Sequence, residues 1–186
     1  MKLFIKNMVC PRCETAVKVA LEKMGVPIIA MKLGEVEIAT DLNKSQMLIL
    51  SKNLNELGFE LLVDKEDKTI ERVKNLLIDL VYYKKEPIKI NFSNYLAEEL
   101  RQDYSILSKL FSEKEGVTIE HFFIAQKIER AKELLIYNEM TLGEIAIHLN
   151  YNDVAHLSNQ FKKTTGLNPT QFKLLNDKKR TDIGAL

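Results

Sequence analysis

The C-terminal half of this 186-residue chain contains one pattern of residues twice, and the second copy follows the first by 50 positions. The first copy consists of Asp103, Leu107, Ser108, Phe111, Gly116 and Phe122, and the second of Asp153, Leu157, Ser158, Phe161, Gly166 and Phe172. Each copy predicts a short helix, a tight turn and a second helix that a glycine ends. This is the layout of a helix-turn-helix, whose second helix is shaped to enter the major groove of DNA. Two such units predict a chain that reads DNA with two helices at once.

Composition limits the class of protein. A chain of 186 residues suits one large domain or two small ones, and 46% hydrophobic residues are enough to bury a core. No apolar run approaches the roughly 20 residues that span a bilayer, and the first residues show no secretory pattern. We therefore expect no membrane association and a cytoplasmic location. The two cysteines are too few and too close in sequence for an extracellular disulfide framework.

The net charge of +1 does not decide whether the partner is a nucleic acid. The distribution of charge is more informative, because the stretch from residue 162 to residue 180 has a single acid, Asp177. Its basic residues are Lys162, Lys163, Lys173, Lys178, Lys179 and Arg180. A basic end beside a predicted recognition helix fits contacts with DNA phosphates, although an ordinary solvated helix face has the same composition.

Residues 1–64 mix strand and helix patterns. The predicted strands are Lys2–Val9, Pro27–Met31, Glu35–Ala39 and Phe59–Val63, and the predicted helices are Pro11–Met24 and Ser45–Leu57, with Ser45 as the cap of the second helix. The order β-α-β-β-α-β is the ferredoxin-like arrangement, in which two helices cover one face of the sheet. With a helical remainder, the chain is predicted to be α+β.

The remaining residues divide into three predicted segments. Residues 65–86 form a helical connector whose apolar stripe could pack on either domain or on its twin in a dimer. Residues 87–180 hold both helix-turn-helix units, with Asp103 and Asp153 capping the recognition helices, and residues 181–186 form a tail. A long helix, Thr118–Tyr137, joins the two units. Its length of roughly 30 Å is close to the distance of about 34 Å between adjacent major grooves on one face of DNA.

Fixed spacings in the C-terminal half match a known family. The second unit contains Glu144-Ile145-Ala146, Leu149, Tyr151, Asp153, His156-Leu157-Ser158, Phe161-Lys162, Gly166-Leu167, Pro169 and Phe172, and the long helix contains Lys127-Ile128, Arg130-Ala131 and Leu134-Leu135. These residues resemble the C-terminal domain of AraC/XylS-type bacterial transcription regulators. The resemblance covers both helix-turn-helix units. It implies sequence-specific binding of double-stranded DNA and control of transcription initiation, usually by activation through RNA polymerase.

Carried over position by position, the resemblance places base-facing side chains on the solvent side of each recognition helix. The candidates are Ser105, Ser108 and Lys109 in the first helix and Ala155, His156, Ser158 and Asn159 in the second. Asparagine can pair with adenine, lysine can donate to guanine, and alanine can meet a thymine methyl group. Lys162, Lys163 and the amides at helix starts are expected to hold phosphates. Neither base-facing set contains the arginine that the family often has there, which suggests modest affinity or reading of DNA shape.

A second motif, Asn7-Met8-Val9-Cys10-Pro11-Arg12-Cys13, joins a predicted strand to a predicted helix. It resembles the loop of the heavy-metal-associated domain of copper chaperones and transport ATPases, although Asn7 stands where that family usually has glycine. Two close thiolates at a helix N-terminus favour soft ions such as Cu(I), or supply part of a zinc site. The resemblance implies metal binding at Cys10 and Cys13. A thiol redox pair and a domain that serves only packing or dimer contacts are the alternatives.

These patterns predict a DNA-binding transcription regulator that responds to metal or thiol chemistry at Cys10 and Cys13. Its partners would be double-stranded DNA and RNA polymerase, and the connector and front domain could support a homodimer. A metal-trafficking protein and a redox enzyme are the alternatives from other classes. The chain contains nothing that resembles a nucleotide-binding loop, a catalytic triad or a carboxylate pair, so we expect no enzyme.

Overall fold

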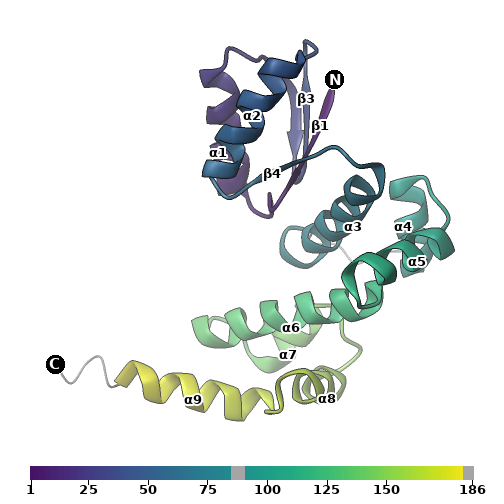
Figure 1. The fold of residues 1–186 in the computed structure, drawn as a ribbon. Helices are drawn as coiled ribbons and strands as arrows, with labels where there is room; N and C mark the ends of the chain where they lie inside the picture. Colours follow the sequence, from purple (N-terminus) through teal and green to yellow (C-terminus); the bar gives the residue numbers. More distant parts are fainter. Residues whose placement is uncertain (85–90, 182–186) are drawn as a thin grey trace. The chain divides into compact units, whose positions relative to one another are not determined.

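The computed structural model describes the backbone of residues 1–84 and 91–181, and side chains as far as Leu175. One four-stranded sheet lies near the N-terminus, and helices follow it (Figure 1). Among the described residues, every helix is too short or too polar to cross a bilayer. The predicted end of the connector at Glu86-Pro87 and most of the predicted tail at 181–186 lie outside the described residues.

The described chain forms two compact units, and these do not follow the predicted boundaries at residues 65 and 87. The first unit comprises residues 1–79 and 91–116, and the second comprises residues 80–84 and 117–181. The first helix-turn-helix therefore shares a unit with the sheet instead of with its repeat. The predicted connector contributes residues to both units.

The front of the first unit has the element order β-α-β-β-α-β, in agreement with the sequence. Its elements are β1 (Lys2–Lys6), α1 (Pro11–Lys23), β2 (Ile28–Lys32), β3 (Glu35–Ile38), α2 (Lys44–Glu56) and β4 (Glu60–Leu62). The strands stand in the order β2-β3-β1-β4, and every neighbouring pair is antiparallel. The register pairs Leu3 of β1 with Val36 of β3, and Ile5 of β1 with Leu61 of β4.

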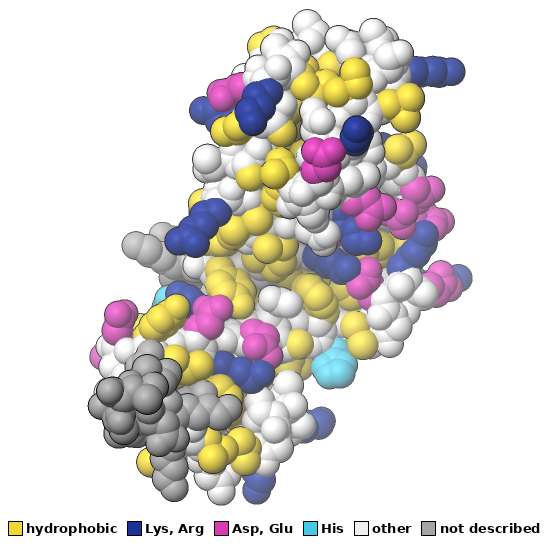
Figure 2. Space-filling view, turned by 60° about the vertical axis from the view of Figure 1, so that its left-hand side comes forward, with side chains coloured by type: hydrophobic (Ala, Val, Ile, Leu, Met, Phe, Trp, Pro, Cys, Tyr) yellow, Lys and Arg dark blue, Asp and Glu magenta, His cyan; other side chains and the backbone are white. Residues whose placement is uncertain are grey.

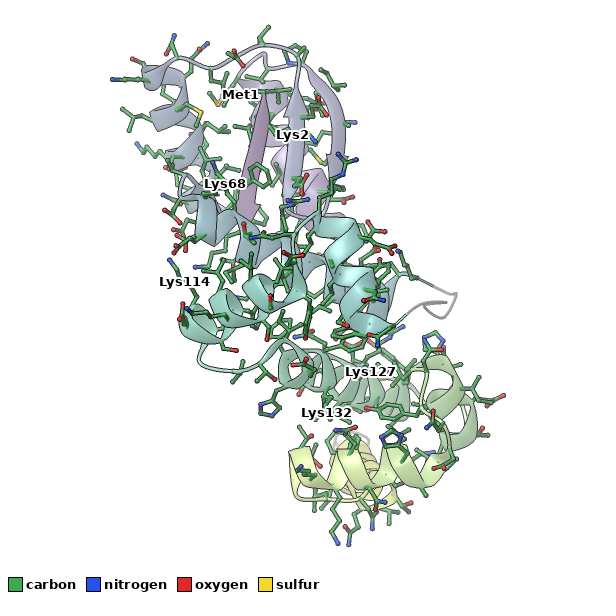
Figure 3. All side chains as sticks on the ribbon, turned by 90° about the vertical axis from the view of Figure 1, so that its right-hand side faces the viewer. Met1, Lys2, Lys68, Lys114, Lys127 and Lys132 are labelled. Carbon is green, nitrogen blue, oxygen red and sulfur yellow. The ribbon has the colours of Figure 1, made fainter. Side chains whose placement is uncertain are left out.

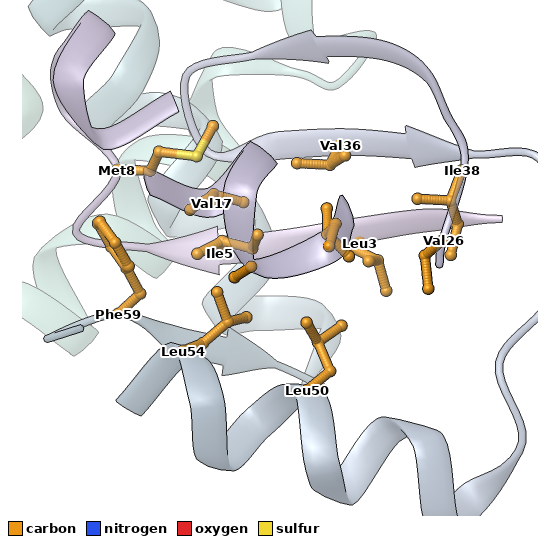
Figure 4. Close-up of a cluster of buried hydrophobic side chains, with 12 residues drawn as sticks. Leu3, Ile5, Met8, Val17, Val26, Val36, Ile38, Leu50, Leu54 and Phe59 are labelled. Atoms are coloured by element: carbon orange, nitrogen blue, oxygen red, sulfur yellow. The ribbon is translucent and has the colours of Figure 1, made fainter. Parts of the chain in front are cut away.

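The core of this front domain lies between the sheet and the two helices (Figure 4). Side chains alternate along β1, so Leu3 and Ile5 are buried while their neighbours are partly exposed. Val17 of α1 and Leu50 and Leu54 of α2 meet them from the helix side. The alternation of a half-buried strand and the helical spacing of apolar residues therefore meet in one core.

The start of α2 differs from the prediction. Asn43, and not Ser45, is the N-cap residue, since its side chain accepts a hydrogen bond of 2.9 Å from the backbone N–H of Gln46. The Gln46 side chain accepts in return from the backbone N–H of Asn43, also at 2.9 Å. This reciprocal capping box satisfies two donors that the helix start would leave unpaired, whereas Ser45 alone could satisfy one.

The predicted connector is a single helix, α3 (Lys65–Tyr82), which begins where Asp64 accepts hydrogen bonds from the N–H groups of Glu66 and Asp67. Its apolar stripe is buried within one chain at Ile70, Val73 and Leu77. Val81, near the end of α3, belongs to the core of the second unit. The stripe therefore has partners without a second copy of the chain.

Six further helices follow within the described residues. They are α4 (Phe92–Leu100), α5 (Tyr104–Glu115), α6 (Ile119–Tyr137), α7 (Leu142–His148), α8 (Val154–Thr165) and α9 (Pro169–Thr181). The pairs α4-α5 and α7-α8 are the two predicted helix-turn-helix units, and α6 is the long helix between them. The last helix, with 13 residues, is longer than the short helix that the sequence suggested.

The sequence repeat is also a repeat of backbone conformation. Arg101 and Asn150 follow α4 and α7 directly or closely, and both adopt left-handed conformations with φ of 53° and 55°. Gly116 and Gly166 end α5 and α8 with φ of 71° and 80°. Four apolar side chains of the recognition helices are fully buried: Leu107, Phe111, Leu157 and Phe161. The left-handed turns are positions that favour glycine or asparagine.

Candidate nucleic-acid interface and cysteine pair

The second recognition helix, α8, has a polar face without an acidic side chain. Leu157 and Phe161 face the core, and the exposed residues include Ala155, His156, Asn159, Lys162 and Lys163. Ser158 is half-buried at the edge of this face. The helix contains no Asp or Glu after its cap. The structure thus brings together all the residues predicted for the second unit on one helix, with Ser158 less accessible than the others.

Hydrogen bonding and ring contacts fix the start of α8. The Asp153 carboxylate accepts a hydrogen bond of 2.6 Å from the backbone N–H of His156, which confirms the predicted cap. The His156 ring stands edge-on to the ring of Tyr151, with centroids 5.1 Å apart. These contacts hold the exposed histidine at the first turn of the helix, so its orientation is set before any ligand arrives.

Beneath α8, the long helix α6 supplies an unusual lysine. The Lys127 ammonium group, labelled in Figure 3, lies 4.9 Å from the ring centroids of both Phe123 and Tyr151. Burial lowers the pKa of Lys127 to about 8 and raises the pKa of Tyr151 to about 12. Sequence analysis did not single out this pair. The contact ties the second helix-turn-helix to α6 through a cation and two aromatic faces.

The lysines at the end of α8 keep their charge available. Neither Lys162 nor Lys163 forms an ion pair with any side chain that the structure describes. Lys173 of the predicted basic stretch donates a hydrogen bond to Asn138. The side chains of Lys178, Lys179 and Arg180 lie outside the described residues.

The first recognition helix, α5, has a different electrostatic setting. Ser105 and Lys109 are exposed and Ser108 is half-buried, but the Lys109 ammonium lies 3.9 Å from the Glu113 carboxylate. Asp103 occupies the N-cap position without the predicted side-chain hydrogen bond to the helix start. The Asp103 carboxylate therefore does not cap α5 in the way that the Asp153 carboxylate caps α8.

Ion pairs connect the end of α5 with α3 inside the first unit. Lys114 lies 3.2 Å from Glu66 and 3.0 Å from Asp67, and Lys74 lies 2.7 Å from Glu115. A groove of about 650 Å³ runs between the two helices, and its lining includes Ser105, Lys109, Glu66 and Glu113. The predicted base-facing residues of α5 thus stand beside acids. On the molecular face drawn in Figure 2, basic and acidic side chains stand close together in the same way.

The two cysteines lie where the loop after β1 becomes α1. Cys10 is the N-cap residue, Pro11 opens the helix, and the Cys10 carbonyl accepts hydrogen bonds from the N–H groups of Cys13 and Glu14. The two sulfur atoms are 3.1 Å apart, and both residues are half-buried. The hydrogen bond from Cys13 lowers the pKa of the Cys10 thiol, and the charge of Arg12 contributes least. Burial raises the pKa of Cys13.

Cys10 is therefore the more acidic thiol of the pair, and the neighbouring Cys13 thiol lowers its pKa most, with Arg12 as a minor contributor. Met8 of the motif is fully buried in the front core (Figure 4), and Cys13 packs against the same cluster. Within the described residues, no group of three or more His, Cys, Asp or Glu side chains suits a metal ion. Two soft sulfur ligands fit Cu(I) better than a closed four-ligand zinc site.

The structure explains the asparagine that departs from the heavy-metal-associated pattern. Asn7 has a φ of 69°, in the left-handed region where glycine is favoured and asparagine is tolerated. Its side-chain amide donates to the Gly58 carbonyl, and its backbone N–H donates to the Glu71 carboxylate, both at 3.1 Å. Sequence analysis missed Glu71, although a carboxylate directly beside the apolar stripe of α3 was an available signal.

Comparison with known proteins identifies the C-terminal part. Residues 96–174, from α4 to α9, match the family described as Helix-turn-helix domain. An uncharacterised HTH-type transcriptional regulator of Staphylococcus aureus is 35% identical over 78 residues, which are 42% of this chain and 10% of that protein. The arabinose operon regulatory protein of Escherichia coli is 30% identical over 79 residues, which are 42% of this chain and 27% of that protein.

Residues 96–174 therefore resemble the helix-turn-helix domains of transcription regulators. Two solved structures share this fold. The C-terminal domain of AraT, a response regulator from Geobacillus stearothermophilus, aligns with a TM-score of 0.51 at 22% identity, over 60% of this chain and 88% of that one. An AraC-type transcriptional regulator from Chromobacterium violaceum aligns with a TM-score of 0.52 at 14% identity, over 59% and 93%. The chain spans about a tenth of the staphylococcal relatives and about a quarter of the arabinose regulator.

Proposed function

We propose that this protein is a sequence-specific DNA-binding transcription regulator of the AraC type. The observation that carries the proposal is the exposed polar face of α8, which includes two lysines that pair with no acid among the described side chains. A helix with this surface can lie in a major groove while its basic end meets phosphates. The transcription regulators among its relatives support the same function.

Within this proposal, the two units divide the work of binding. His156, Asn159 and Ala155 of α8 read base edges, and Lys162 and Lys163 hold phosphates. Ser105, Ser108 and Lys109 of α5 make a second and weaker contact, because acids stand beside them. The distance between the two recognition helices on DNA stays a prediction from the length of α6.

The front domain is proposed to be a ferredoxin-like effector domain that changes the affinity of the chain for DNA. Cys10 and Cys13 would hold Cu(I), which supplies a soft cation that two thiolates can bind. The support is the pair of sulfur atoms 3.1 Å apart at a helix start and the lowered pKa of Cys10. Regulation requires that the bound and free states bind DNA unequally.

The test is fluorescence anisotropy with DNA from upstream of the protein's own gene. The reduced protein is titrated with and without Cu(I), beside the Cys10→Ser, Cys13→Ser chain. We expect a Cu(I)-dependent change in Kd in the wild type and none in the double variant. Binding of equal strength to this DNA and to an unrelated duplex at moderate salt would exclude a sequence-specific regulator and revive metal trafficking.

A single substitution tests whether α8 contacts bases. Asn159→Ala should weaken binding to the selected site by roughly 1–3 kcal/mol, the range for one bidentate contact with adenine, and leave binding to unrelated DNA unchanged. Ser112→Ala on α5 is the matched control. An equal loss of affinity for the selected site and for unrelated DNA would show that Asn159 contacts phosphates instead of bases.

A thiol redox response is the second candidate, and the lowered pKa of Cys10 favours it, because the thiolate is the reactive form. An effect of oxidant on DNA affinity without an effect of Cu(I) would select it. Contact with RNA polymerase, a homodimer, a front domain used only for protein contacts, and a cytoplasmic location stay predictions.

A further inference from the structure

We propose that Glu71 of α3 is a positioning residue that holds the cysteine loop and links it, through α3, to the first recognition helix, α5. The link to DNA binding rests on the proposed response at Cys10 and Cys13. It adds the route by which that response reaches a helix-turn-helix.

The first step is the contact between Glu71 and the loop. β1 ends at Lys6 and α1 begins at Pro11, so residues 7–10 form the connection that carries Cys10. The backbone N–H of Asn7 donates to Glu71 at 3.1 Å. Glu71 is only 6% exposed. A carboxylate in this position needs hydrogen-bond donors, and the donor here is the backbone of the cysteine loop.

Two contacts hold α3 against the sheet. The Arg72 guanidinium lies 2.9 Å from the Glu35 carboxylate of β3, and the Lys68 ammonium lies 5.5 Å from the ring centroid of Phe4 in β1. Lys68 and Arg72 flank Glu71 along the helix. The helix residues on either side of Glu71 are therefore anchored to the sheet. The cysteine loop is the less regular of the two partners in the hydrogen bond between Asn7 and Glu71.

The third step connects α3 with α5. Lys74 is three residues after Glu71, which places the two side chains on neighbouring positions of one helix face. Lys74 lies 2.7 Å from Glu115 at the end of α5, where its side chain is 19% exposed. Lys114, labelled in Figure 3, adds the pairs with Glu66 and Asp67. The start and the middle of α3 thus form ion pairs with the last turn of α5.

These contacts form a physical route inside one compact unit. A change in the cysteine loop alters the position of the Asn7 N–H, and α3 adjusts at Glu71 to keep its hydrogen bond. The ion pairs at Lys74 and Lys114 pass that adjustment to α5. Spatial continuity alone does not establish coupling, so the test measures the loop and the DNA affinity separately.

The first measurement reports on the loop alone. Alkylation of Cys10 by iodoacetamide is followed against pH in the wild type, Glu71→Met and Glu71→Gln. Methionine removes the acceptor, so the rate at neutral pH should change by about threefold, which corresponds to half a unit in thiol pKa. Glutamine keeps an acceptor oxygen and should stay near the wild type. Glu56→Gln, at an exposed acid of α2, is the matched control. An unchanged profile in Glu71→Met overturns the inference.

The second measurement reports on the route. Lys74→Met should leave the alkylation profile unchanged and reduce the factor by which Cu(I) changes DNA affinity. Glu71→Met should reduce that factor as well. Circular dichroism verifies that each variant is folded. If Glu71→Met does not fold, Glu71→Ala, which also lacks the acceptor oxygen, takes its place in both measurements.

The outcomes separate this inference from the proposed function. If the Cys10→Ser, Cys13→Ser chain keeps the wild-type effect of Cu(I), or the wild type shows none, the proposed metal response fails, and the alkylation profile alone decides whether Glu71 positions the loop. If the double variant loses the effect while Glu71→Met and Lys74→Met retain it in full, the proposed function stands and the route through α3 is overturned.

Discussion

The two helix-turn-helix units have the same backbone and different surroundings. Both end a first helix near a left-handed residue, bury two apolar side chains of the second helix and close on glycine. Yet α5 ends in ion pairs with α3, whereas α8 presents two lysines that pair with no described acid. The repeated residues therefore specify the fold of each unit, whereas the residues between them determine what the surface of that unit can bind.

A second difference lies at the turn. Position 102 is glutamine in the first unit, and the corresponding position of the second unit is Tyr151. Tyr151 contacts both Lys127 and His156, so the second recognition helix has an aromatic contact at the position where the first unit has Gln102. The first unit instead uses charged contacts with α3. Aromatic contacts keep their strength in salt, and ion pairs near the surface lose theirs.

The largest expected effect tests whether the two units are independent. Phe111→Ala and Phe161→Ala should each destabilise the chain by roughly 3–5 kcal/mol, the usual cost of emptying a buried phenylalanine site. Hydrogen exchange should rise in β1 to α5 for Phe111→Ala and in α6 to α9 for Phe161→Ala. Loss of protection in the same segments for both variants would show that the units unfold together.

The next effect concerns Lys127, which has no counterpart in the first unit. Its pKa is about 8 in the folded chain, below its ordinary value of 10.5. Between these values the unfolded chain binds the extra proton, so stability should rise with pH, and the cost of the buried charge is fully present below pH 8. The free energy of unfolding should rise by at most about 3 kcal/mol. The rings of Phe123 and Tyr151 reduce this rise, because their faces stabilise the charged form of Lys127.

Urea unfolding between pH 7 and 9.5, below the pH at which Tyr151 ionises in the unfolded chain, measures most of this rise for the second unit, with hydrogen exchange in α8 as the local probe. Lys127→Met should remove the pH dependence in that window, and Lys132→Met, on the same helix, should retain it. A second unit whose stability is flat from pH 8 to 9.5 in the wild type would show that the rings compensate the burial of the charge completely.

A smaller effect separates the two recognition helices on DNA. Lys162→Ala and Lys163→Ala should each reduce affinity by about fivefold near 0.15 M salt and lower the salt slope by about one, as expected for a lost phosphate contact. Lys109→Ala should cost less, because Glu113 already partners this lysine. Anisotropy titrations over a series of salt concentrations measure both quantities. A larger loss of affinity for Lys109→Ala than for Lys162→Ala and Lys163→Ala would show that α5, and not α8, makes the stronger contact with DNA.

The smallest effect compares the two caps. Asp153→Ala should destabilise the second unit by about 1 kcal/mol, because its carboxylate bonds the N–H of His156. Asp103→Ala should be close to neutral, since the carboxylate makes no such bond. Protection of backbone amides from hydrogen exchange in α8 measures the effect of Asp153→Ala, and protection in α5 measures the effect of Asp103→Ala. Equal effects would mean that Asp103 caps α5 in solution.

Much of the fold could be predicted from the sequence because its local patterns are strong. Alternation along β1, the helical stripe of α1 and the spacing around Gly116 and Gly166 each determine one element and one buried face. The residues predicted for α8 lie together because a helix places side chains by spacing alone. Ser45 was the wrong cap, since serine and asparagine are both good caps and two of them stand close together at that helix start.

The division into units could not be predicted, because it depends on contacts between residues far apart in the chain. Glu71 meets Asn7 across 64 positions and Lys114 meets Asp67 across 47. No local pattern identifies such pairs. The sequence marked residues 65–86 as a connector because they lie between two recognisable motifs, whereas the charged face of α3 makes it part of the structure on both sides.

The position of α3 affects how this chain can be shortened or recombined. A fragment that starts at residue 87 would expose Lys114 and Glu115 without their ionic partners, and would also lack Val81 from the core of the second unit. A fragment that starts at Lys65 keeps both. Exchange of the front domain for another sensor would therefore preserve the DNA-binding half only if the junction falls before α3. A new sensor would also need its own hydrogen-bond donor for the Glu71 carboxylate, in place of the backbone N–H of Asn7.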